Sequence, residues 1–416
     1  MASRRLDSCL FSFLLLILLF TLSIFISNLR PPQIPRLPIQ AGSTSSSTDV
    51  TPKIFIVAFY DEEGEIWQND NPSFDLSSEL SVPGLSPLFP SVRCTLDHQI
   101  CMLVTGEGEI NAAVSMTALL FSGVFDLSHT YFILAGTAGI NPRIGSVGSV
   151  AISRFVVQPS LQYEFDARDK PENFSTGYVP LGSHNSSQYP QEIYGTEVFE
   201  LNAALRDAAI ALARTVELND TEASAAYKEL YVADPHDYPL YGNAASPPAV
   251  LECDTATSDT FIAGAWLGVA WANYTHTVTN GRGVYCMAAQ EDAAVLEALV
   301  RADAAGLADF RRALVMRAGS DYDRPPVGMS AAENLWHGYE GYVPALRNLF
   351  LTGSKVIEGI LDGWDDKFEM GIMAENYVGD VLDTLGGEQD YGPAASETWD
   401  YDAAPGHEEP APPETG

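Results

Sequence analysis

Carboxyl and hydroxyl side chains follow several apolar segments of this sequence, at points where strands would end. A carboxyl group can act as a general acid or base, and glycine allows a ligand to approach the backbone. Each group taken alone also fits an acidic turn, a tight turn or a cap. The candidates are Asp61–Glu63 with Glu63 last, Thr137 with Gly136 and Gly139, and Ser320 with Asp321.

Two further segments combine polar residues with groups that could hold a ligand. Phe261 and Ile262 follow the polar run 257–260, and Phe261 could stack on a base or lie in the core. Glu291 opens a predicted helix, where the helix dipole favours acidic side chains with or without a ligand. These segments indicate a binding site only if the fold brings them together with the carboxyl groups.

Alternating strands and helices are predicted to position these groups. Continuous apolar runs such as 53–59 and 131–134 are typical of strands covered on both faces. Such alternation predicts a layered α/β fold with a parallel or mixed sheet, in which ligands bind at the carboxyl ends of strands. The predicted strands are 53–59, 100–105, 131–134, 147–157 and 313–317, and the predicted helices are 111–122, 197–215, 261–272, 292–305 and 342–361.

The two ends of the chain differ in composition from the region between them. Residues 9–29 are apolar and long enough to span a bilayer, and they follow a short cytoplasmic segment, 1–8, that contains Arg4 and Arg5. This pattern predicts a signal anchor or a signal peptide, with the rest of the chain secreted or in the lumen. Residues 30–52 are predicted to be a stalk, 53–385 a globular domain and 386–416 an acidic disordered tail.

Sequons and cysteines agree with a secretory route. Four N-glycosylation sequons begin at Asn173, Asn185, Asn219 and Asn273. Cys94 and Cys101 flank a predicted hairpin turn, where a disulfide could form in an oxidising compartment. Cys253 and Cys286 are a second pair, and free buried thiols remain the alternative for both pairs.

The charge of the chain excludes some classes of partner. Its 55 acidic and 22 basic residues give a formal net charge of −33, which disfavours nucleic acid and other polyanions. A neutral or cationic small ligand fits this surface better. The spacing of the cysteines and histidines does not suggest a metal site.

Taken in order along the chain, the short motifs resemble the nucleoside phosphorylase/nucleosidase superfamily and, within it, the purine nucleoside permeases. The resemblance implies a three-layer α/β/α fold with a mixed central sheet, no metal or organic cofactor, and a possible homo-oligomer. The matching segments are Lys53–Val57 with Asp61–Glu63, Thr105–Asn111, Gly136–Gly139, Ser258–Ile262, Gln290–Ala294 and Arg317–Asp321.

The resemblance also implies roles for individual residues in a pocket for a purine nucleoside. Asp321 would protonate N7 of the base, and Glu63 would activate water. Phe261 would stack on the base, Glu291 would hold the ribose hydroxyls, and Thr137 would position the attacking group. Gly136, Ile262 and Ser320 are further substrate-binding candidates in the same motifs.

Departures from the family pattern bear on the reaction. Leu134 stands where phosphorylases have a phosphate-binding Arg, and Asp61–Glu63 replace their glycine-and-arginine loop. Carboxylates would repel phosphate, so hydrolysis by a purine nucleosidase is expected over phosphorolysis, with phosphate kept as a possible partner. Ala289 also stands where nucleosidases have an additional Glu.

Transport of purine nucleosides is the alternative that the permease group suggests. A single apolar segment cannot enclose a polar path through a membrane, because a pore needs several helices or a closed barrel. Under this alternative the chain would bind a nucleoside and pass it to a carrier with several spans. A catalytically inactive surface protein is a third, weaker alternative.

Overall fold

The computed structural model describes residues 50–392 except 69–72, 167, 175, 233–240, 338 and 390. The helices are α2 (Asp61–Gln68), α3 (Glu109–Leu120), α4 (Ala203–Ala213), α5 (Glu222–Glu229), α7 (Ala265–Val278), α8 (Asp292–Ala304), α9 (Ala331–His337) and α10 (Tyr342–Asp362). The strands of the first half are β1 (Ile54–Ala58), β2 (Ser78–Ser81), β3 (Ser91–Cys94), β4 (Ile100–Val104), β5 (Tyr131–Ile140), β6 (Val150–Ile152), β7 (Phe155–Val157), β8 (Gln162–Glu164) and β9 (Tyr178–Pro180). Those of the second half are β10 (Val198–Glu200), β11 (Val250–Leu251), β12 (Asp254–Thr257), β13 (Tyr285–Ala289), β14 (Ala313–Tyr322) and β15 (Gly379–Asp380).

One mixed sheet of thirteen strands forms the centre of the described part of the chain. Its main path runs β15-β10-β7-β12-β13-β5-β1-β4-β3-β2, and β14 and β6 join it beside β5. Strand β5 pairs in parallel with β1 and β14, and its last residues pair antiparallel with β13. The strand therefore connects three neighbours, and the ends of those neighbours meet near its second half.

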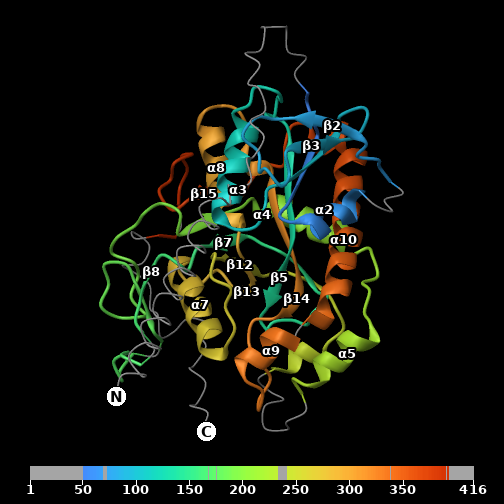
Figure 1. Cartoon of the computed structure of the whole chain (residues 1–416). Coiled ribbons are helices and arrows are strands. Elements are labelled where there is room, and N and C mark those ends of the chain that lie inside the picture. The colour runs from blue at the N-terminus through green and yellow to red at the C-terminus, as the bar shows by residue number, and fades with distance from the viewer. Residues whose placement is uncertain are drawn as a thin grey trace, which may run out of the picture. The chain divides into compact units, whose positions relative to one another are not determined.

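Helices cover both faces of the sheet because side chains of a strand alternate between faces. On β1, Phe55 and Val57 pack into one core with side chains of α3 and α8. Ile54 and Ile56 pack into a second core with side chains of α4 and α10. Figure 1 shows α3 and α8 on one side of the strands and α10 on the other. The predicted three-layer α/β/α class with a mixed sheet is confirmed.

Several local predictions were wrong in detail. Residues 136–139 are not a turn but the second half of β5, because this glycine-rich segment is paired with β14 and β13. Residues 147–157 form two strands, β6 and β7, rather than one. Residues 197–215 hold β10 before helix α4, and the acidic residues 61–63 begin helix α2.

The four cysteines among the described residues form two disulfides that join neighbouring strands. Cys94 on β3 bonds Cys101, its register partner on β4. Cys253, just before β12, bonds Cys286 on β13. The second disulfide links the two strands that lead to the residues 257–262 and 290–291.

The predicted sequons differ in their accessibility. Asn173, Asn185 and Asn219 are exposed, whereas Asn273 is half-buried in α7. Thr275, the hydroxyl residue of that last sequon, is fully buried. Because glycans need an exposed acceptor, the first three positions are the better candidates for modification.

The predicted segments 1–8 and 9–29, most of the stalk 30–52 and most of the tail 386–416 lie outside the described residues. Among the residues that are described, no helix is both long and apolar enough to cross a bilayer. Tyr391, beyond the predicted end of the domain, is buried against Phe155 and Tyr377.

Candidate active site

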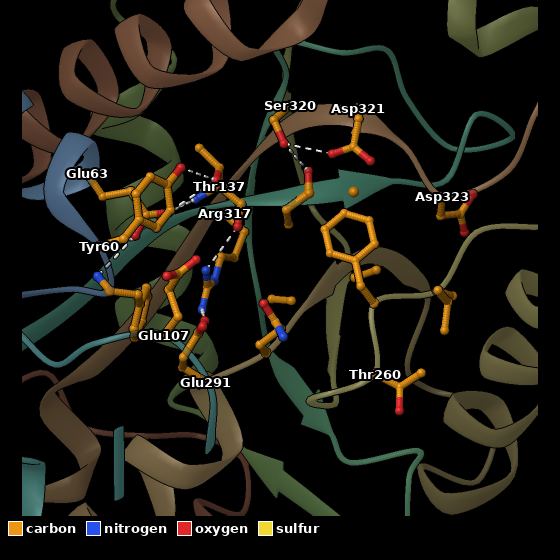
Figure 2. Close-up of a pocket in the computed structure, with 18 of the residues that line it drawn as sticks. Tyr60, Glu63, Glu107, Thr137, Thr260, Glu291, Arg317, Ser320, Asp321 and Asp323 are labelled. Carbon is orange, nitrogen blue, oxygen red and sulfur yellow. Dashed lines mark hydrogen bonds and ion pairs between the residues drawn. The ribbon is translucent and has the colours of Figure 1, made fainter. Parts of the chain in front are cut away.

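A pocket of about 130 Å³ lies where β1, β5, β13 and β14 meet. Figure 2 shows Glu63, Tyr60, Thr137, Arg317 and Glu291 gathered at one end, and Asp321, Asp323 and Thr260 away from them. We call these the Glu63 end and the Asp321 end. The lining residues are Phe59, Tyr60, Glu63, Glu107, Thr137, Ala138, Gly139, Thr260, Phe261, Ile262, Trp271, Ala288, Ala289, Gln290, Glu291, Arg317, Ser320, Asp321 and Asp323.

Glu63 is fully buried in the first turn of α2, and backbone donors hold its carboxylate in place. The Phe59 amide donates to Oε2 at 3.0 Å, and the Thr137 amide donates to Oε1 at 2.5 Å. Burial raises the pKa of Glu63 to about 8, although the positive charge of Arg317 opposes this rise. Glu63 is therefore a proton acceptor of raised basicity at the edge of a pocket.

Tyr60 and Thr137 form a pair of hydroxyl groups beside Glu63. The Tyr60 hydroxyl lies 2.8 Å from Thr137 Oγ1, which is 3.1 Å from Glu63 Oε1. Burial and the Glu63 charge raise the pKa of Tyr60, which keeps its hydroxyl protonated. The chain of hydroxyls can accept and donate protons to a polar ligand atom or a water molecule next to Glu63.

Arg317 on β14 is the basic residue of the Glu63 end, and each of its three nitrogens donates a hydrogen bond to the protein. Its Nη2 donates to Glu291 Oε2 at 2.9 Å and its Nε to Asp292 Oδ2 at 3.0 Å. Nη1 donates to the Thr137 carbonyl at 2.9 Å, and the guanidinium lies 4.1 Å from the centroid of the Phe59 ring. Burial lowers the pKa of Arg317, but Asp292 and Glu291 raise it by more.

Glu291 lies at the N-terminal end of α8 and bridges two parts of the pocket. Its Oε2 accepts from Arg317, and its Oε1 accepts from the Gly108 amide at 3.0 Å. Gly108 has a φ of 86°, a left-handed conformation that favours glycine at this contact. The carboxylate of Glu291 is thus fixed in the lining of the pocket, to which Glu63 and Thr137 also belong.

Asp321 is placed in the pocket by a β-bulge near the end of β14. The pairing of β14 with β5 shifts between Gly319 and Asp321, so Ser320 is an extra residue that re-aims its neighbour. The Ser320 hydroxyl donates to Asp321 Oδ1 at 2.8 Å and lies 3.2 Å from the Ala138 carbonyl. Burial raises the pKa of Asp321 to about 6; the Ser320 hydroxyl opposes the rise and Asp323 adds to it.

An apolar wall lies near Asp321. Phe261 is 56% exposed and lines the pocket together with Ile262 and Trp271, which are both buried. Trp271 comes from α7 and packs edge-on against Tyr285. An aromatic face beside a protonatable carboxyl suits a flat, nitrogen-containing ring.

The structure brings together all but one of the predicted site residues. Glu63, Thr137, Phe261, Ile262, Glu291, Ser320 and Asp321 line the same pocket. Gly136 lies behind the lining, where a Cβ atom would come within 2.9 Å of Glu63 Oε1 and would also clash with Arg317. Its role is to leave room for the buried ion pairs.

Sequence reasoning missed several lining residues. Tyr60 is adjacent to the predicted acidic cluster, and Asp323 is two positions after Asp321, just beyond the end of β14, so spacing could have pointed to both. Glu107 lies within the matching segment Thr105–Asn111, although it was not named as a site residue. Trp271 gave no such signal, because it enters the pocket from a distant helix. In the part of the chain that the structure describes, no group of three or more His, Cys, Asp or Glu residues is arranged to hold a metal ion.

Comparison with known proteins gives the family. Residues 51–373 match the profile of the purine nucleoside permease (NUP) family. The chain belongs to this family. A purine nucleoside permease of Candida albicans is 39% identical over 354 residues, which are 83% of this chain and 84% of that protein. A probable purine nucleoside permease of Schizosaccharomyces pombe is 37% identical and covers 79% of this chain and 94% of its own length.

The solved structures that are similar to this purine nucleoside permease family member are more distant in sequence. A 5′-methylthioadenosine/S-adenosylhomocysteine nucleosidase from Neisseria meningitidis is 15% identical, with a TM-score of 0.44, and covers 74% of this chain and 99% of its own. Futalosine hydrolase of Helicobacter pylori is 15% identical, with a TM-score of 0.43, over 75% of this chain and 97% of its own.

Proposed function

We propose that this protein binds purine nucleosides and cleaves their N-glycosidic bond with water. The observation that carries the proposal is one pocket with two carboxyl groups of raised pKa, Glu63 and Asp321, at its two ends. Phe261 adds an exposed aromatic side chain to the lining of the same pocket. Two carboxyl groups on either side of a glycosidic bond can supply an acid and a base.

Asp321 acts as the general acid at the base. Phe261 stacks on the purine and directs its N7 toward the Asp321 carboxyl, whose raised pKa keeps part of the population protonated. The proton moves from Asp321 to N7 as the bond between sugar and base breaks, and the purine leaves as a neutral molecule. Positioned acid catalysis of this kind contributes about 10²–10⁴-fold.

Glu291 and Glu63 act at the sugar. Glu291, held by Arg317 and Gly108, accepts hydrogen bonds from the ribose hydroxyls, and its charge favours the oxocarbenium-like transition state. Glu63 takes a proton from a water molecule as the water oxygen bonds to the anomeric carbon. Thr137 orients that water through its hydroxyl group.

The charge of the pocket favours water over phosphate as the attacking group. Five lining residues are acidic (Glu63, Glu107, Glu291, Asp321 and Asp323), whereas Arg317 is the one basic residue of the described lining. Each of its three nitrogens already donates a hydrogen bond, and its charge is paired with Glu291 and Asp292. An entering phosphate would meet like charges without a cation to pair with.

Base release from inosine and adenosine tests the proposal. The purified chain should release free base in phosphate-free buffer, and added phosphate should not accelerate the reaction. Ribose, not ribose 1-phosphate, should be the sugar product. A rate that rises with phosphate would contradict the proposal that water is the attacking group. Binding without any base release would contradict the proposed enzymatic activity.

Uptake of purine nucleosides is the second candidate, favoured by the names of relatives that are 37–39% identical. In this role the same pocket would hold the nucleoside without cleaving it. Liposomes that contain only this protein separate the two candidates. Accumulation of labelled, uncleaved nucleoside inside them would support transport, whereas base release without accumulation would support the enzyme.

A further inference from the structure

Glu107 is an exposed lining residue of the pocket that the proposed mechanism does not use. Figure 2 shows it at the Glu63 end, on the same side as Glu291. Within the part of the chain that the structure describes, its carboxylate forms no hydrogen bond or ion pair, and its backbone carbonyl accepts from Asn111 Nδ2 at 2.7 Å. Protein donors hold the carboxylates of Glu63 and Glu291, whereas that of Glu107 remains available to a ligand.

The backbone around Glu107 is held on both sides. The Thr105 hydroxyl donates to the Gly106 carbonyl at 2.9 Å, and the Gly108 amide donates to Glu291 Oε1 at 3.0 Å. Both neighbours of Glu107 are glycines with a left-handed φ, 87° at Gly106 and 86° at Gly108. The turn therefore fixes Glu107 next to the residue that bonds the carboxylate proposed to hold the ribose hydroxyls.

The surroundings of Glu107 are rich in acceptors and negative charge. Burial raises the pKa of Tyr342 at the start of α10, and a hydrogen bond with Tyr60 opposes the rise. The charges of Glu62, Glu63 and Glu107 add to the rise, so all three carboxyl groups act on one phenol. A hydrogen-bond donor or a cation is therefore favoured beside Glu107, and an anion is disfavoured.

The stereochemistry of a ribonucleoside indicates which ligand group lies there. The base and the 5′ carbon project from one face of the ribose ring, and the 2′ and 3′ hydroxyls project from the other. In the proposed reaction the base extends toward Asp321, and the 2′ and 3′ hydroxyls contact Glu291. The 5′ group is then the remaining substituent of the sugar, and Glu107 is the remaining acidic residue at the Glu63 end.

We propose that Glu107 determines specificity for the 5′ group of the nucleoside by accepting a hydrogen bond from it. The pocket then favours a 5′-hydroxyl or a cationic 5′-amino group and disfavours a 5′-phosphate. The proposal rests on the proposed function for its class of ligand, a purine nucleoside, and it names the part of that ligand which Glu107 contacts.

Ligands that differ only at the 5′ position test the proposal in the wild type and in Glu107→Ala. A hydrogen bond to a charged group is worth about tenfold or more in affinity, so the wild type should prefer adenosine over 5′-deoxyadenosine by this factor. It should bind 5′-amino-5′-deoxyadenosine at least as tightly as adenosine. Glu107→Ala should lose both preferences, and adenosine 5′-phosphate should gain about tenfold relative to adenosine because a like charge is removed.

Two further variants separate the hydrogen bond from the charge. Glu107→Gln keeps an acceptor oxygen without the charge, so it should retain part of the preference for the 5′-hydroxyl and discriminate less against the phosphate. Glu62→Ala is the matched control, because it removes an exposed carboxylate that also acts on Tyr342 but does not line the pocket. It should leave the ratio of the affinities for adenosine and 5′-deoxyadenosine unchanged.

The other sugar hydroxyls supply a result that would contradict the proposal. Glu107→Ala should weaken 2′-deoxyadenosine and 3′-deoxyadenosine by the same factor as adenosine, because both keep the 5′-hydroxyl. If the effect of the substitution vanishes in either compound, Glu107 contacts that hydroxyl instead, and the proposal is overturned. An equal effect of Glu107→Ala on adenosine and 5′-deoxyadenosine would overturn it as well.

Binding measurements distinguish this proposal from the proposed cleavage. Dissociation constants from calorimetry are compared, with kcat/KM in their place for any ligand that releases base. A 5′ preference without base release would support the role of Glu107 and contradict cleavage alone, whereas base release without a 5′ preference would overturn the role of Glu107 alone. If a variant does not fold, the wild-type comparison decides, and equal affinities for adenosine and 5′-deoxyadenosine would overturn the proposal.

Discussion

At the Glu63 end of the pocket, charged groups are bonded to one another, whereas at the Asp321 end the reactive carboxyl has one hydroxyl partner. Glu63 accepts from two amides and lies near Arg317, yet burial raises its pKa to about 8. Asp321 accepts from Ser320 and its pKa is raised to about 6. The comparison shows that burial, more than the number of partners, sets the protonation of both groups.

This order of pKa values has a consequence for catalysis. Cleavage as proposed needs Glu63 ionised and Asp321 protonated. At pH values between about 6 and 8 the opposite combination, Glu63 protonated and Asp321 ionised, is the more populated one. The fraction of molecules in the required combination is about 1% and nearly constant in that interval, because the gain in one group cancels the loss in the other. The four predictions below test the difference between the two ends, from the largest expected effect to the smallest.

Asp321→Asn removes the proton donor at one end and should have the largest effect on turnover. We expect kcat for base release to fall by about 10²–10⁴-fold. The affinity for nucleoside should change little, because the amide keeps the size of the side chain and can still bond Ser320. Steady-state kinetics and calorimetry measure the two quantities. A fall of less than tenfold would show that N7 is not protonated by this residue.

Arg317→Met breaks the ion pairs of the other end and should mainly affect stability. Glu291 and Asp292 would remain buried without their cation, which typically costs about 3–5 kcal/mol in the free energy of unfolding. Urea denaturation measures this change. Arg301→Met is the matched control, because Arg301 forms an exposed pair with Glu297 and should cost about 0–1 kcal/mol. Equal losses in the two variants would contradict the buried network.

The pH dependence of kcat/KM should separate the two carboxyl groups. The wild type should be nearly flat between pH values of about 6 and 8, and should lose about tenfold per pH unit outside that range. Below the range the loss comes from protonation of Glu63, and above it from ionisation of Asp321. Glu63→Gln should no longer lose activity at low pH, because the group whose protonation causes that loss is absent. Its residual activity should fall only above about pH 6, where Asp321 ionises. An unchanged acidic limb in this variant would exclude Glu63 as the base.

Ser320→Ala should have the smallest effect, less than about tenfold on kcat/KM, because it removes one hydrogen bond. That bond lowers the pKa of Asp321, so its loss should move the lower limb of the pH profile upward and narrow the flat range. A profile identical to the wild type would show that the hydroxyl does not act on Asp321. Thr130→Val, which removes a buried hydroxyl bonded to the Pro52 carbonyl far from the lining, controls for the loss of a buried hydroxyl group.

The sequence predicted the layered fold and most of the catalytic candidates because these depend on local patterns. Strand β1 could be recognised from its continuous apolar run, and Glu63 and Asp321 from short motifs that follow such runs. The extra residue at Ser320 could not be predicted, because a bulge is defined by the register with another strand. The glycines at 136 and 139 indicated a turn, but long-range pairing with β13 and β14 makes this segment a strand.

Other features depend on contacts between distant segments. The Gly108 amide donates a hydrogen bond to Glu291, which is 183 positions away, and no local sequence pattern predicts such a contact. The same holds for Trp271, whose helix looked like an ordinary buried element. The network around Arg317 joins segments from α2, β5, α8 and β14, so it becomes visible only when the sheet is assembled.

The pairing of β5 with β1, β13 and β14 also bears on what happens after the reaction. Thr137 and Gly139 of this strand lie next to the two ends of the pocket, so the rigid strand fixes the separation of the two ends. In the proposed reaction, an intact nucleoside bonds to both ends at once, but after cleavage the free base contacts one end and the free sugar the other. Each product keeps only part of the interactions of the substrate. If the proposed cleavage occurs, we therefore expect weak inhibition by either product.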